Sequence, residues 1–544
     1  MKGYAAVAEV LRREGVEQVF CFPASPLIDA AAAAGIRPIV GRTERTVINM
    51  ADGFTRVSNG HRNGVVMVQN GPGIENAFGG MAQAAADSTP ILMLPRGEAS
   101  DRLGLPGQFD AVANYRGITK WADRFSSPAR IPAQLRRAFT YLRAGHPGPV
   151  LLETPADVGA AELDGDLAYE PVPRRRAAGD PAAVAEAARL LLAAKRPVLH
   201  VGQGVLYAEG TAALVELAEL VQAPVMTTFL GKSAFPENHP LAVGAGGSTV
   251  SGGIRHFLPR ADLVFSVGAS LARTLASCAI PTGGTLVQCT ATERDLNAEY
   301  PLDHAVLGDA RLVLEQLCEE VRRQAGPDGR RGDDGAAREV AQVRAQVMEE
   351  WLPLLTSTAV PMNPYRVIWD LMHAVDRTRT IVTHDSGSPR NQMAVFWESL
   401  VPRGYLGWGN STQLGFSLGL AMGAKIAAPD KLVINVLGDA AIGMCGLDLE
   451  TAARERIAIL TVLLNNSAMG NYEKMQPVAV ERYNIKRLSG DYSGVARALG
   501  VWSERVEDPG EIVPALRRAQ AVIAEGRPAL LEMITAEEPA EMRL

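Results

Sequence analysis

The chain alternates short apolar segments with longer helical segments along its whole length. In residues 4–158 the apolar segments are QVFCF, PIVG, GVVMVQN, PILMLP and GPVLLETP, and amphipathic stretches separate them. Apolar runs of this kind are typical of parallel strands, which are buried on both faces by the helices that connect them. The alternation therefore predicts an α/β architecture of doubly wound parallel sheets.

Two polar breaks divide the chain into three such blocks. The first, YEPVPRRRAAGDP, covers residues 169–181, and the second, AGPDGRRGDDGAARE, covers residues 325–339. The second break is rich in glycine and charge, so we expect it to be solvated and flexible. One hydrophobic core rarely serves more than about 300 residues, and this chain has 544. We therefore expect three α/β domains, at residues 1–168, 182–325 and 340–544.

Composition argues against several classes of partner. With a net charge of −6, 47% hydrophobic and 21% charged residues, the chain offers no electrostatic case for nucleic acid or an anionic membrane. Its five cysteines are scattered without a CxxC or Cys/His spacing, which argues against disulfides and zinc. No apolar run approaches the length of a membrane span, and the N-terminal stretch carries charges throughout. We expect a cytoplasmic protein without membrane or nucleic-acid partners.

Polar residues follow two apolar strands in the third block. KLVINVLGDAAIG, residues 431–443, leaves its strand at Gly438-Asp439, and AILTVLLNN, residues 458–466, leaves its strand at Asn465-Asn466. A right-handed crossover would place these carboxyl ends side by side. Carboxylate and amide oxygens suit Mg²⁺, and small residues let backbone N–H groups approach a diphosphate. Either half alone is more typical of a capping turn, but together they predict a Mg-diphosphate site.

The two pairs resemble the cofactor motif of thiamine-diphosphate-dependent enzymes. The resemblance implies that Asp439 and Asn466 bind Mg²⁺ through their side chains and that Ala468 binds it through its carbonyl oxygen. Other residues of the two loops would then contact thiamine diphosphate, namely Gly438, Ala440, Ala441, Met469 and Gly470. Ala440 stands where the family usually has a second glycine, which leaves the metal ligand in place and tightens the turn.

The first block resembles the family segments that activate the cofactor. VGRTERTVINMADGFTRVSNG, residues 40–60, resembles the segment with the activating glutamate. The resemblance implies that Glu44 hydrogen-bonds the aminopyrimidine ring and starts deprotonation of the thiazolium carbon. On its own, Glu44 would be interpreted as a solvated residue at a helix start. VQNGPGIENAFGG, residues 68–80, resembles the Gly-Pro-Gly loop, which places a group of residues near the substrate, namely Asn70, Gly71, Pro72 and Gly73.

Three more segments of the third block complete the resemblance. HDSGSPRNQM, residues 384–393, would offer Ser386, Gly387 and Ser388 to the diphosphate, although an ordinary strand-to-helix turn would look the same. GNSTQLGFSLGLAMGA, residues 409–424, places Leu414 where the family wedges the cofactor into a bent conformer, although a core leucine is the alternative. The segment at residues 469–488 is expected to cover the pocket and select an anionic or nucleotide-bearing substrate, or else to be a solvated helix and loop.

The middle block extends the resemblance over essentially the whole chain. HVGQGV, TTFLGKSAFPENHPLAVG and ADLVFSVGASL are similar to the central domain of the pyruvate-oxidase, acetolactate-synthase and benzoylformate-decarboxylase group. Tyr207 stands where a GxGxxG dinucleotide motif needs its last glycine, which argues against a nicotinamide dehydrogenase. Relatives bind FAD, ADP or nothing in this domain, and we do not predict FAD. The family also implies a homodimer or homotetramer whose active sites lie at the subunit interface, between the N-terminal domain of one subunit and the C-terminal domain of its partner.

The matched segments are poor in histidine, which bears on the reaction. GEASDRLGLPGQFDAVANYRG, residues 97–117, lacks the histidine pair that pyruvate decarboxylases use to handle protons. This favours an acetolactate-synthase-like enzyme that decarboxylates a 2-oxo acid and transfers the acyl carbanion to an acceptor carbonyl. The alternatives are a non-ligating 2-oxo acid decarboxylase, a lyase that cleaves a 2-hydroxy ketone or a 2-hydroxyacyl-CoA thioester, and a non-catalytic cofactor-binding protein.

Overall fold

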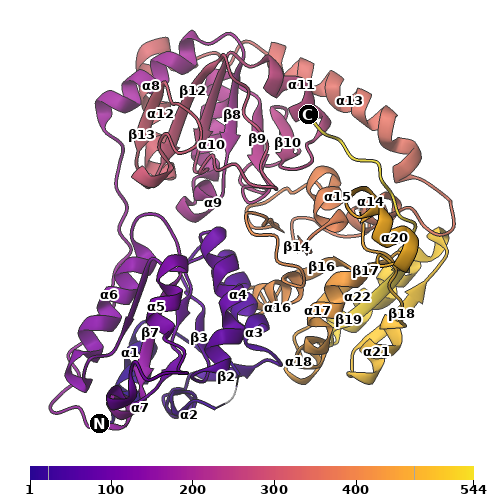
Figure 1. Ribbon diagram of the computed structural model, residues 1–544. Helices are drawn as coiled ribbons and strands as arrows, with labels where there is room; N and C mark the ends of the chain where they lie inside the picture. Colours follow the sequence, from indigo (N-terminus) through magenta and orange to yellow (C-terminus); the bar gives the residue numbers. More distant parts are fainter. Residues whose placement is uncertain (23, 471) are drawn as a thin grey trace.

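Three parallel β-sheets, each covered by helices, form the computed structural model, which describes residues 1–22, 24–470 and 472–544 (Figure 1). All pairings between the strands of the described residues are parallel. The expected α/β class with three doubly wound parallel sheets is confirmed. We propose that the three sheets belong to the three domains bounded as the sequence predicts.

The first sheet has the strand order β2-β1-β3-β4-β7-β5, and β6 pairs with β7. Its strands are β1 (Gln18–Cys21), β2 (Arg37–Val40), β3 (Val65–Met67), β4 (Leu92–Met93), β5 (Arg96–Gly97), β6 (Trp121–Arg124) and β7 (Val150–Pro155). The helices of this part are α1 (Gly3–Arg13), α2 (Pro26–Ala33), α3 (Glu44–Val57), α4 (Pro72–Ala86), α5 (Ala111–Tyr115), α6 (Ile131–Arg143) and α7 (Ala156–Ala160).

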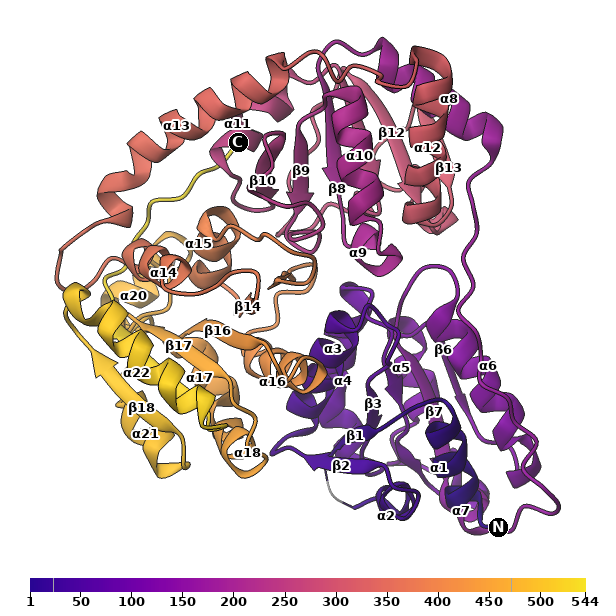
Figure 2. The same cartoon turned by 180° about the vertical axis from the view of Figure 1, so that it is seen from behind.

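The second sheet has the strand order β10-β9-β8-β11-β12-β13. Its strands are β8 (Pro197–Val201), β9 (Val225–Thr228), β10 (Ala242–Gly246), β11 (Leu263–Val267), β12 (Thr285–Thr290) and β13 (His304–Leu307). The helices of this part are α8 (Pro181–Ala193), α9 (Gly204–Ala208), α10 (Thr211–Val221), α11 (Gly252–Phe257), α12 (Ala310–Ala325) and α13 (Gly335–Leu355). Helix α13 runs along the outside of the molecule from the second sheet toward the third (Figure 2).

The third sheet has the strand order β15-β14-β16-β17-β19-β18. Its strands are β14 (Thr380–His384), β15 (Tyr405–Leu406), β16 (Leu432–Gly438), β17 (Leu460–Asn465), β18 (Trp502–Val506) and β19 (Ala529–Ile534). The helices of this part are α14 (Pro364–His373), α15 (Ser388–Phe396), α16 (Ser417–Ala427), α17 (Asp439–Cys445), α18 (Leu449–Arg454), α19 (Tyr472–Met475), α20 (Pro477–Tyr483), α21 (Tyr492–Ala498) and α22 (Ile512–Ala524).

The second polar break differs from the expected flexible linker. Residues 335–339 already belong to α13, and Arg330 anchors the exposed stretch before it. The Arg330 N–H donates to the Leu220 carbonyl at 2.7 Å, and its guanidinium donates to the Ala194 carbonyl at 3.0 Å. Glycine and charge therefore indicate solvent exposure here, while the hydrogen bonds of Arg330 hold part of the segment against the second domain.

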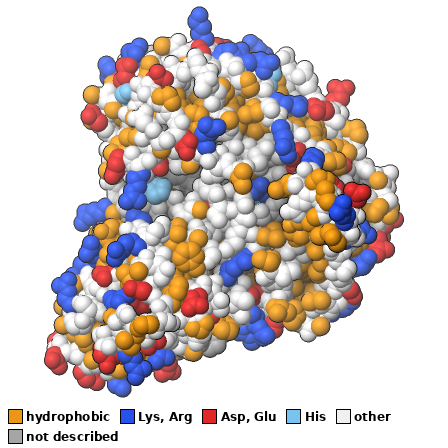
Figure 3. Space-filling view, in the orientation of Figure 1, with side chains coloured by type: hydrophobic (Ala, Val, Ile, Leu, Met, Phe, Trp, Pro, Cys, Tyr) orange, Lys and Arg blue, Asp and Glu red, His pale blue; other side chains and the backbone are white. Residues whose placement is uncertain are grey.

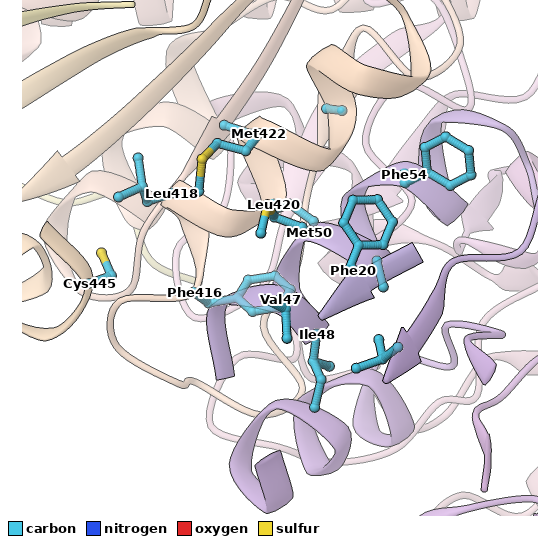
Figure 4. Close-up of a cluster of buried hydrophobic side chains, with 14 of the residues drawn as sticks. Phe20, Val47, Ile48, Met50, Phe54, Phe416, Leu418, Leu420, Met422 and Cys445 are labelled. Atoms are coloured by element: carbon cyan, nitrogen blue, oxygen red, sulfur yellow. The ribbon is translucent and has the colours of Figure 1, made fainter. Parts of the chain in front are cut away.

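Helices α3 and α16 lie between the first and third sheets and join them into one core. Buried side chains of both helices belong to a single hydrophobic cluster with residues of both sheets, and Figure 4 shows Val47, Met50, Leu420 and Met422 within it. The two backbones approach closely because the contact positions are glycines. A Cβ on Gly423 would lie 1.9 Å from the Met50 carbonyl oxygen. This packing brings the N-terminal ends of both helices to the same region.

The surface carries both signs of charge. On the face shown in Figure 3, cationic and anionic side chains are interspersed with apolar ones. A search of the described helices for one that is long and apolar enough to cross a membrane finds none.

Candidate functional site

Asp439 and Asn466 converge at the carboxyl ends of two neighbouring strands. Strand β16 ends at Gly438, which precedes Asp439 at the start of α17, and β17 pairs with β16 and ends just before Asn466. Asp439 Oδ2 and Asn466 Oδ1 both accept from the Ala468 N–H, at 3.2 and 3.0 Å. Because one N–H reaches both oxygens, the predicted metal ligands lie within a few ångströms of one another.

The Asp439 carboxylate is held in a polar but mostly dry position. The residue is 4% exposed, and its Oδ1 accepts from the Ala440 N–H at 2.8 Å. Burial raises the pKa of Asp439, and the N–H groups of Ala440 and Ala468 partly oppose this rise. A divalent cation would favour the charged carboxylate here.

The two adjacent asparagines have different surroundings. Asn465 Nδ2 donates to the buried Glu532 at 2.8 Å, and Asn465 Oδ1 accepts from the Ser467 N–H at 3.0 Å. Ser467 adopts a left-handed φ of 54°, so Asn465 stabilises the sharp turn that follows β17. Asn465 thus shapes the loop, and Asn466 is left to face Asp439.

The predicted diphosphate loop after β14 lies beside the loop after β17. Gly387 has a φ of 82° and precedes Ser388, the first residue of α15. A Cβ on Gly470 would lie 3.5 Å from Ser388 Oγ, so these two loops approach closely. Met469 lies in the same loop as Gly470, and its N–H donates to the Lys486 carbonyl at 2.8 Å.

Asp385 is a buried residue of this region that the sequence analysis did not single out. Its Oδ1 accepts from the N–H groups of Ser386 at 2.8 Å and Gly415 at 2.9 Å. Its Oδ2 accepts from the hydroxyl of Ser417 at 2.6 Å. Burial raises the pKa of Asp385, which these hydrogen bonds partly oppose. The signal was available, because an aspartate directly after an apolar strand is the same pattern that identified Asp439.

Glu44 lies at the start of α3, facing the loop before α4. The residue is 4% exposed, and Asn76 Nδ2 donates to its Oε2 at 3.4 Å. A Cβ on Gly73 would lie 3.4 Å from Glu44 Oε1 and 2.6 Å from Gln69 Cγ, so only glycine fits at this position. None of the ion pairs among the described residues involves Glu44. The carboxylate is therefore buried without a cationic partner in this part of the molecule.

The rest of the predicted Gly-Pro-Gly loop shapes the entry to α4. Gly71 adopts a φ of 59°, and Pro72 is the first residue of the helix, where a missing N–H costs nothing. Asn70 Nδ2 donates to Glu98 Oε1. The Asn70 amide thus contacts a carboxylate of its own domain, in a stretch where substrate contacts are predicted.

Leu414 lies at the junction between the parts of the chain that carry the first and the third sheet. It is partly buried against the core that the first and third sheets share, and its carbonyl accepts from the Arg45 guanidinium of the same chain. A Cβ on Gly415 would lie 3.3 Å from the Ala441 carbonyl oxygen, so α17 also lies at this junction. Ala441 itself is buried in the shared core. A single chain thus brings the start of α3, next to Glu44, against the loop before α16.

A fully buried charge network ties all three sheets together behind this junction. The Arg56 guanidinium donates to Asp52, to Asp87 at 3.1 Å, to the Gly407 carbonyl at 2.9 Å and to Gln203 at 3.3 Å. Burial opposes the charge of Arg56, but the carboxylates of Asp52 and Asp87 outweigh it and raise its pKa. The network holds the relative placement of the three parts.

Histidine contributes little near these residues. His384 is fully buried, its ring stacks on Trp408 with centroids 5.3 Å apart, and burial lowers its pKa to about 3. His146 and His200 line a separate cavity of about 160 Å³ at the carboxyl ends of the second sheet. All eight histidines lie within the described residues.

The segment expected to cover the pocket is largely exposed. It contains α19 and α20, and Asn471 lies outside the described residues. Lys486 pairs with Glu537 at 2.9 Å, which ties the segment to the chain after β19. Its role in substrate choice stays a prediction.

The donor set fits a hard cation with a phosphate ligand. The described residues hold no cluster of three or more His, Cys, Asp or Glu side chains that could bind a metal. One carboxylate, one amide oxygen and one carbonyl, as at Asp439, Asn466 and Ala468, are the few protein ligands that Mg²⁺ takes when phosphate and water supply the rest. A Cβ on Gly387 would meet nothing within 4 Å, so this loop leaves space for such a phosphate.

Comparisons with known proteins match this arrangement along the chain. Family models of thiamine pyrophosphate enzymes match the N-terminal TPP binding domain at residues 1–114, the central domain at 184–317 and the C-terminal TPP binding domain at 385–533. The chain is 31% identical to a probable 2-ketoarginine decarboxylase of Pseudomonas aeruginosa, over 94% of this chain and 90% of the relative.

Two further relatives carry other names. A probable acetolactate synthase large subunit of Methanococcus aeolicus is 28% identical over 95% of this chain and 90% of the relative. A glyoxylate carboligase of Escherichia coli O157:H7 is 29% identical over 98% of this chain and 93% of the relative.

Proposed function

Because the chain belongs to the family of thiamine pyrophosphate enzymes, we propose that it is an acetolactate-synthase-like carboligase. It decarboxylates a 2-oxo acid and transfers the acyl group to the carbonyl of an acceptor. The observation that carries this proposal is the meeting of Asp439 and Asn466 at one N–H, together with the burial of Glu44 at the start of α3.

Each predicted residue has a role that its surroundings support. Asp439, Asn466 and the Ala468 carbonyl would hold Mg²⁺. The diphosphate would lie among the loops around Ser386, Gly387, Ser388, Gly438, Ala440, Ala441, Met469 and Gly470. Leu414 would support the bend of the cofactor, and Asn70, Gly71, Pro72 and Gly73 would line the substrate side. The Glu44 carboxylate would hold the proton at the ring nitrogen, and its burial keeps water away from that proton.

The chemistry of the cofactor then decides the reaction class. When bound, thiamine diphosphate supplies a nucleophilic carbon and an electron sink for bonds next to a carbonyl. The residues around the cofactor determine whether the carbanion left by decarboxylation is protonated or transferred to an acceptor. His384 is buried with a pKa lowered to about 3, so it is neutral at neutral pH and stacks on Trp408. Without a protonated histidine at the site, transfer of the carbanion to an acceptor carbonyl is favoured over its protonation.

A non-ligating 2-oxo acid decarboxylase is the second candidate. It is favoured by the relative named a probable 2-ketoarginine decarboxylase, which is 31% identical to this chain. A 2-hydroxyacyl-CoA lyase is the remaining alternative of the same chemistry. The carboligase and the decarboxylase differ in their products, because a carboligase yields a longer hydroxy ketone or hydroxy acid and a decarboxylase yields a free aldehyde.

Incubation with Mg²⁺, thiamine diphosphate and a panel of 2-oxo acids, aldehydes and acyl thioesters tests the proposal. We expect ligated products in mass spectra, and we expect the Glu44→Gln variant to lose them while it still binds the cofactor. Accumulation of free aldehyde alone would contradict the carboligase. Equal activity of the wild type and Glu44→Gln would contradict the assigned activator, and no turnover in any arm would favour a non-catalytic cofactor-binding protein.

We also propose a cytoplasmic homodimer or homotetramer with its active sites at the subunit interface. In that arrangement Glu44 of one chain serves Asp439 of another, although α3 and α16 also pack together within one chain. Co-expression of Glu44→Gln and Asp439→Ala chains separates the two arrangements. Shared sites regain activity in the mixed oligomer, because one of its sites is intact. Sites completed within one chain regain none.

A further inference from the structure

The peptide unit between Leu414 and Gly415 is held at both of its polar atoms. Its N–H, on Gly415, donates to Asp385 Oδ1 at 2.9 Å. Its carbonyl, on Leu414, accepts from the Arg45 guanidinium. Asp385 precedes the predicted diphosphate loop, and Arg45 directly follows Glu44 in α3. One peptide unit is therefore held both by the residue before the predicted diphosphate loop and by the helix that begins with Glu44.

The backbone around this peptide leaves little freedom. Gly415 has a φ of 81°, and a Cβ there would lie 2.6 Å from Met444 Cβ and 3.0 Å from Arg45 Nη2. Only glycine fits at this position, and its conformation presents the preceding carbonyl to Arg45. Asp385 also accepts from the N–H of Ser386 at 2.8 Å, so the amide end of this peptide is held together with the phosphate loop by a carboxylate that does not depend on Arg45.

Arg45 is committed to this contact. It is partly buried, and burial lowers its pKa, which the nearby Asp385 carboxylate partly opposes. The Leu414 carbonyl is the acceptor found for its side chain among the described residues. Successive residues of a helix point in different directions, so Glu44 faces Gly73 while Arg45 faces Leu414. The two neighbours thus have different contacts, Glu44 with the start of α4 and Arg45 with the loop before α16.

We propose that Arg45 is a positioning residue that holds Leu414 against the bend of the cofactor. This inference rests on the function proposed above, because it assumes that the cleft takes thiamine diphosphate. The guanidinium holds the Leu414 carbonyl from α3, so it fixes the loop that carries the supporting side chain. Its loss frees Leu414 and leaves the phosphate ligands in place.

Binding of two probes tests this role without measuring activity. Thiamine diphosphate with Mg²⁺ contacts the phosphate loops and Leu414, whereas inorganic pyrophosphate with Mg²⁺ contacts the phosphate loops only. Arg45→Leu should weaken binding of thiamine diphosphate about tenfold, the cost of one lost charge-assisted hydrogen bond, and leave the affinity for pyrophosphate unchanged. Arg45→Lys should recover only part of the loss, because an ammonium lacks the reach and planar fork of a guanidinium.

Arg42→Leu is the matched control. Arg42 lies just before α3, and its side chain is 54% exposed, so the variant loses the same charge without touching Leu414. It should bind both probes like the wild type. Equal losses for both probes in Arg45→Leu, or no loss for either, would overturn the positioning role. If the wild-type protein bound neither probe, the proposed function would fail and this inference with it.

Discussion

The carboxylate of Asp439 and the amide oxygen of Asn466 accept hydrogen bonds from the same backbone N–H, that of Ala468. Two residues from different strand ends are thereby directed at one point. Their convergence follows from the fold, since β16 and β17 are adjacent parallel strands whose carboxyl ends lie at the same edge of the sheet. The candidate metal site is therefore a consequence of strand order.

Replacing the activating carboxylate should separate catalysis from binding. In Glu44→Gln the side chain keeps its size and can still contact Asn76, but it no longer carries the charge that would hold a proton at the ring nitrogen. We expect kcat to fall by about 10²–10⁴-fold, the usual contribution of a positioned acid or base. The dissociation constant for thiamine diphosphate, measured by calorimetry, should stay close to that of the wild type. Loss of cofactor binding in this variant would show that Glu44 is structural.

Removing the central cation of the buried network should destabilise the protein strongly. Arg56→Met leaves the carboxylates of Asp52 and Asp87 buried without their partner. A broken buried pair costs about 3–5 kcal/mol, so the urea midpoint should fall markedly. The exposed Arg12, which pairs with Glu9 at the surface, provides the control. Arg12→Met should leave the urea midpoint nearly unchanged, because an exposed ion pair contributes little to stability. Similar effects of both variants would contradict the assigned role of the network.

The contact between α3 and α16 should not tolerate an added methyl group. A Cβ on Gly423 would meet the Met50 carbonyl oxygen at 1.9 Å, so Gly423→Ala must push the helices apart. We expect a loss of about 1–3 kcal/mol in the free energy of unfolding. At Gly332 nothing lies within 4 Å of the added Cβ, so Gly332→Ala should be nearly neutral in the same unfolding experiment. An equally stable Gly423→Ala protein would mean that the two helices are not packed in this way.

Stability should depend on pH through His200. This residue is 4% exposed, bonds Ser266 Oγ at 3.0 Å, and has a pKa lowered by burial to about 4. The unfolded chain therefore binds a proton below about pH 6.5 that the folded chain refuses until about pH 4, so acid favours unfolding. Between about pH 7 and pH 5 this group alone removes about 2 kcal/mol of stability.

His200→Gln should flatten that part of the pH dependence. Glutamine can keep a hydrogen bond to Ser266 but does not titrate. Urea unfolding at the two pH values measures the difference directly, for the variant and for the wild type. A variant with the same acid sensitivity as the wild type would show that other groups control this range.

Much of this architecture can be predicted from the pattern of apolar strands. β14, β16, β17 and β19 are rich in apolar residues and are buried along nearly all of their length, so they stand out in the sequence. β6 and β18 do not, because they carry Trp, Asp, Glu and Arg and are half exposed. Edge strands of this kind gain their structure from the neighbour that they pair with, which no local pattern records.

The same division holds for the candidate site. Asp439, Asn466 and Ser386 each follow an apolar strand, so strand ends identified them before the fold was known. Arg45 gave no such signal, because its partner is a backbone carbonyl that lies 369 positions away in the sequence. Contacts of this kind depend on how the first and third sheets pack together, and only the three-dimensional arrangement reveals them.

Calorimetric titration of thiamine diphosphate in the presence and absence of Mg²⁺ tests the central claim most directly. We predict binding to the wild type that requires Mg²⁺ and disappears with a chelator. Asp439→Ala should lose at least about 100-fold in affinity, or about 3 kcal/mol, because a metal ligand is removed. Binding of equal strength with and without Mg²⁺, or in wild type and Asp439→Ala alike, would contradict the account.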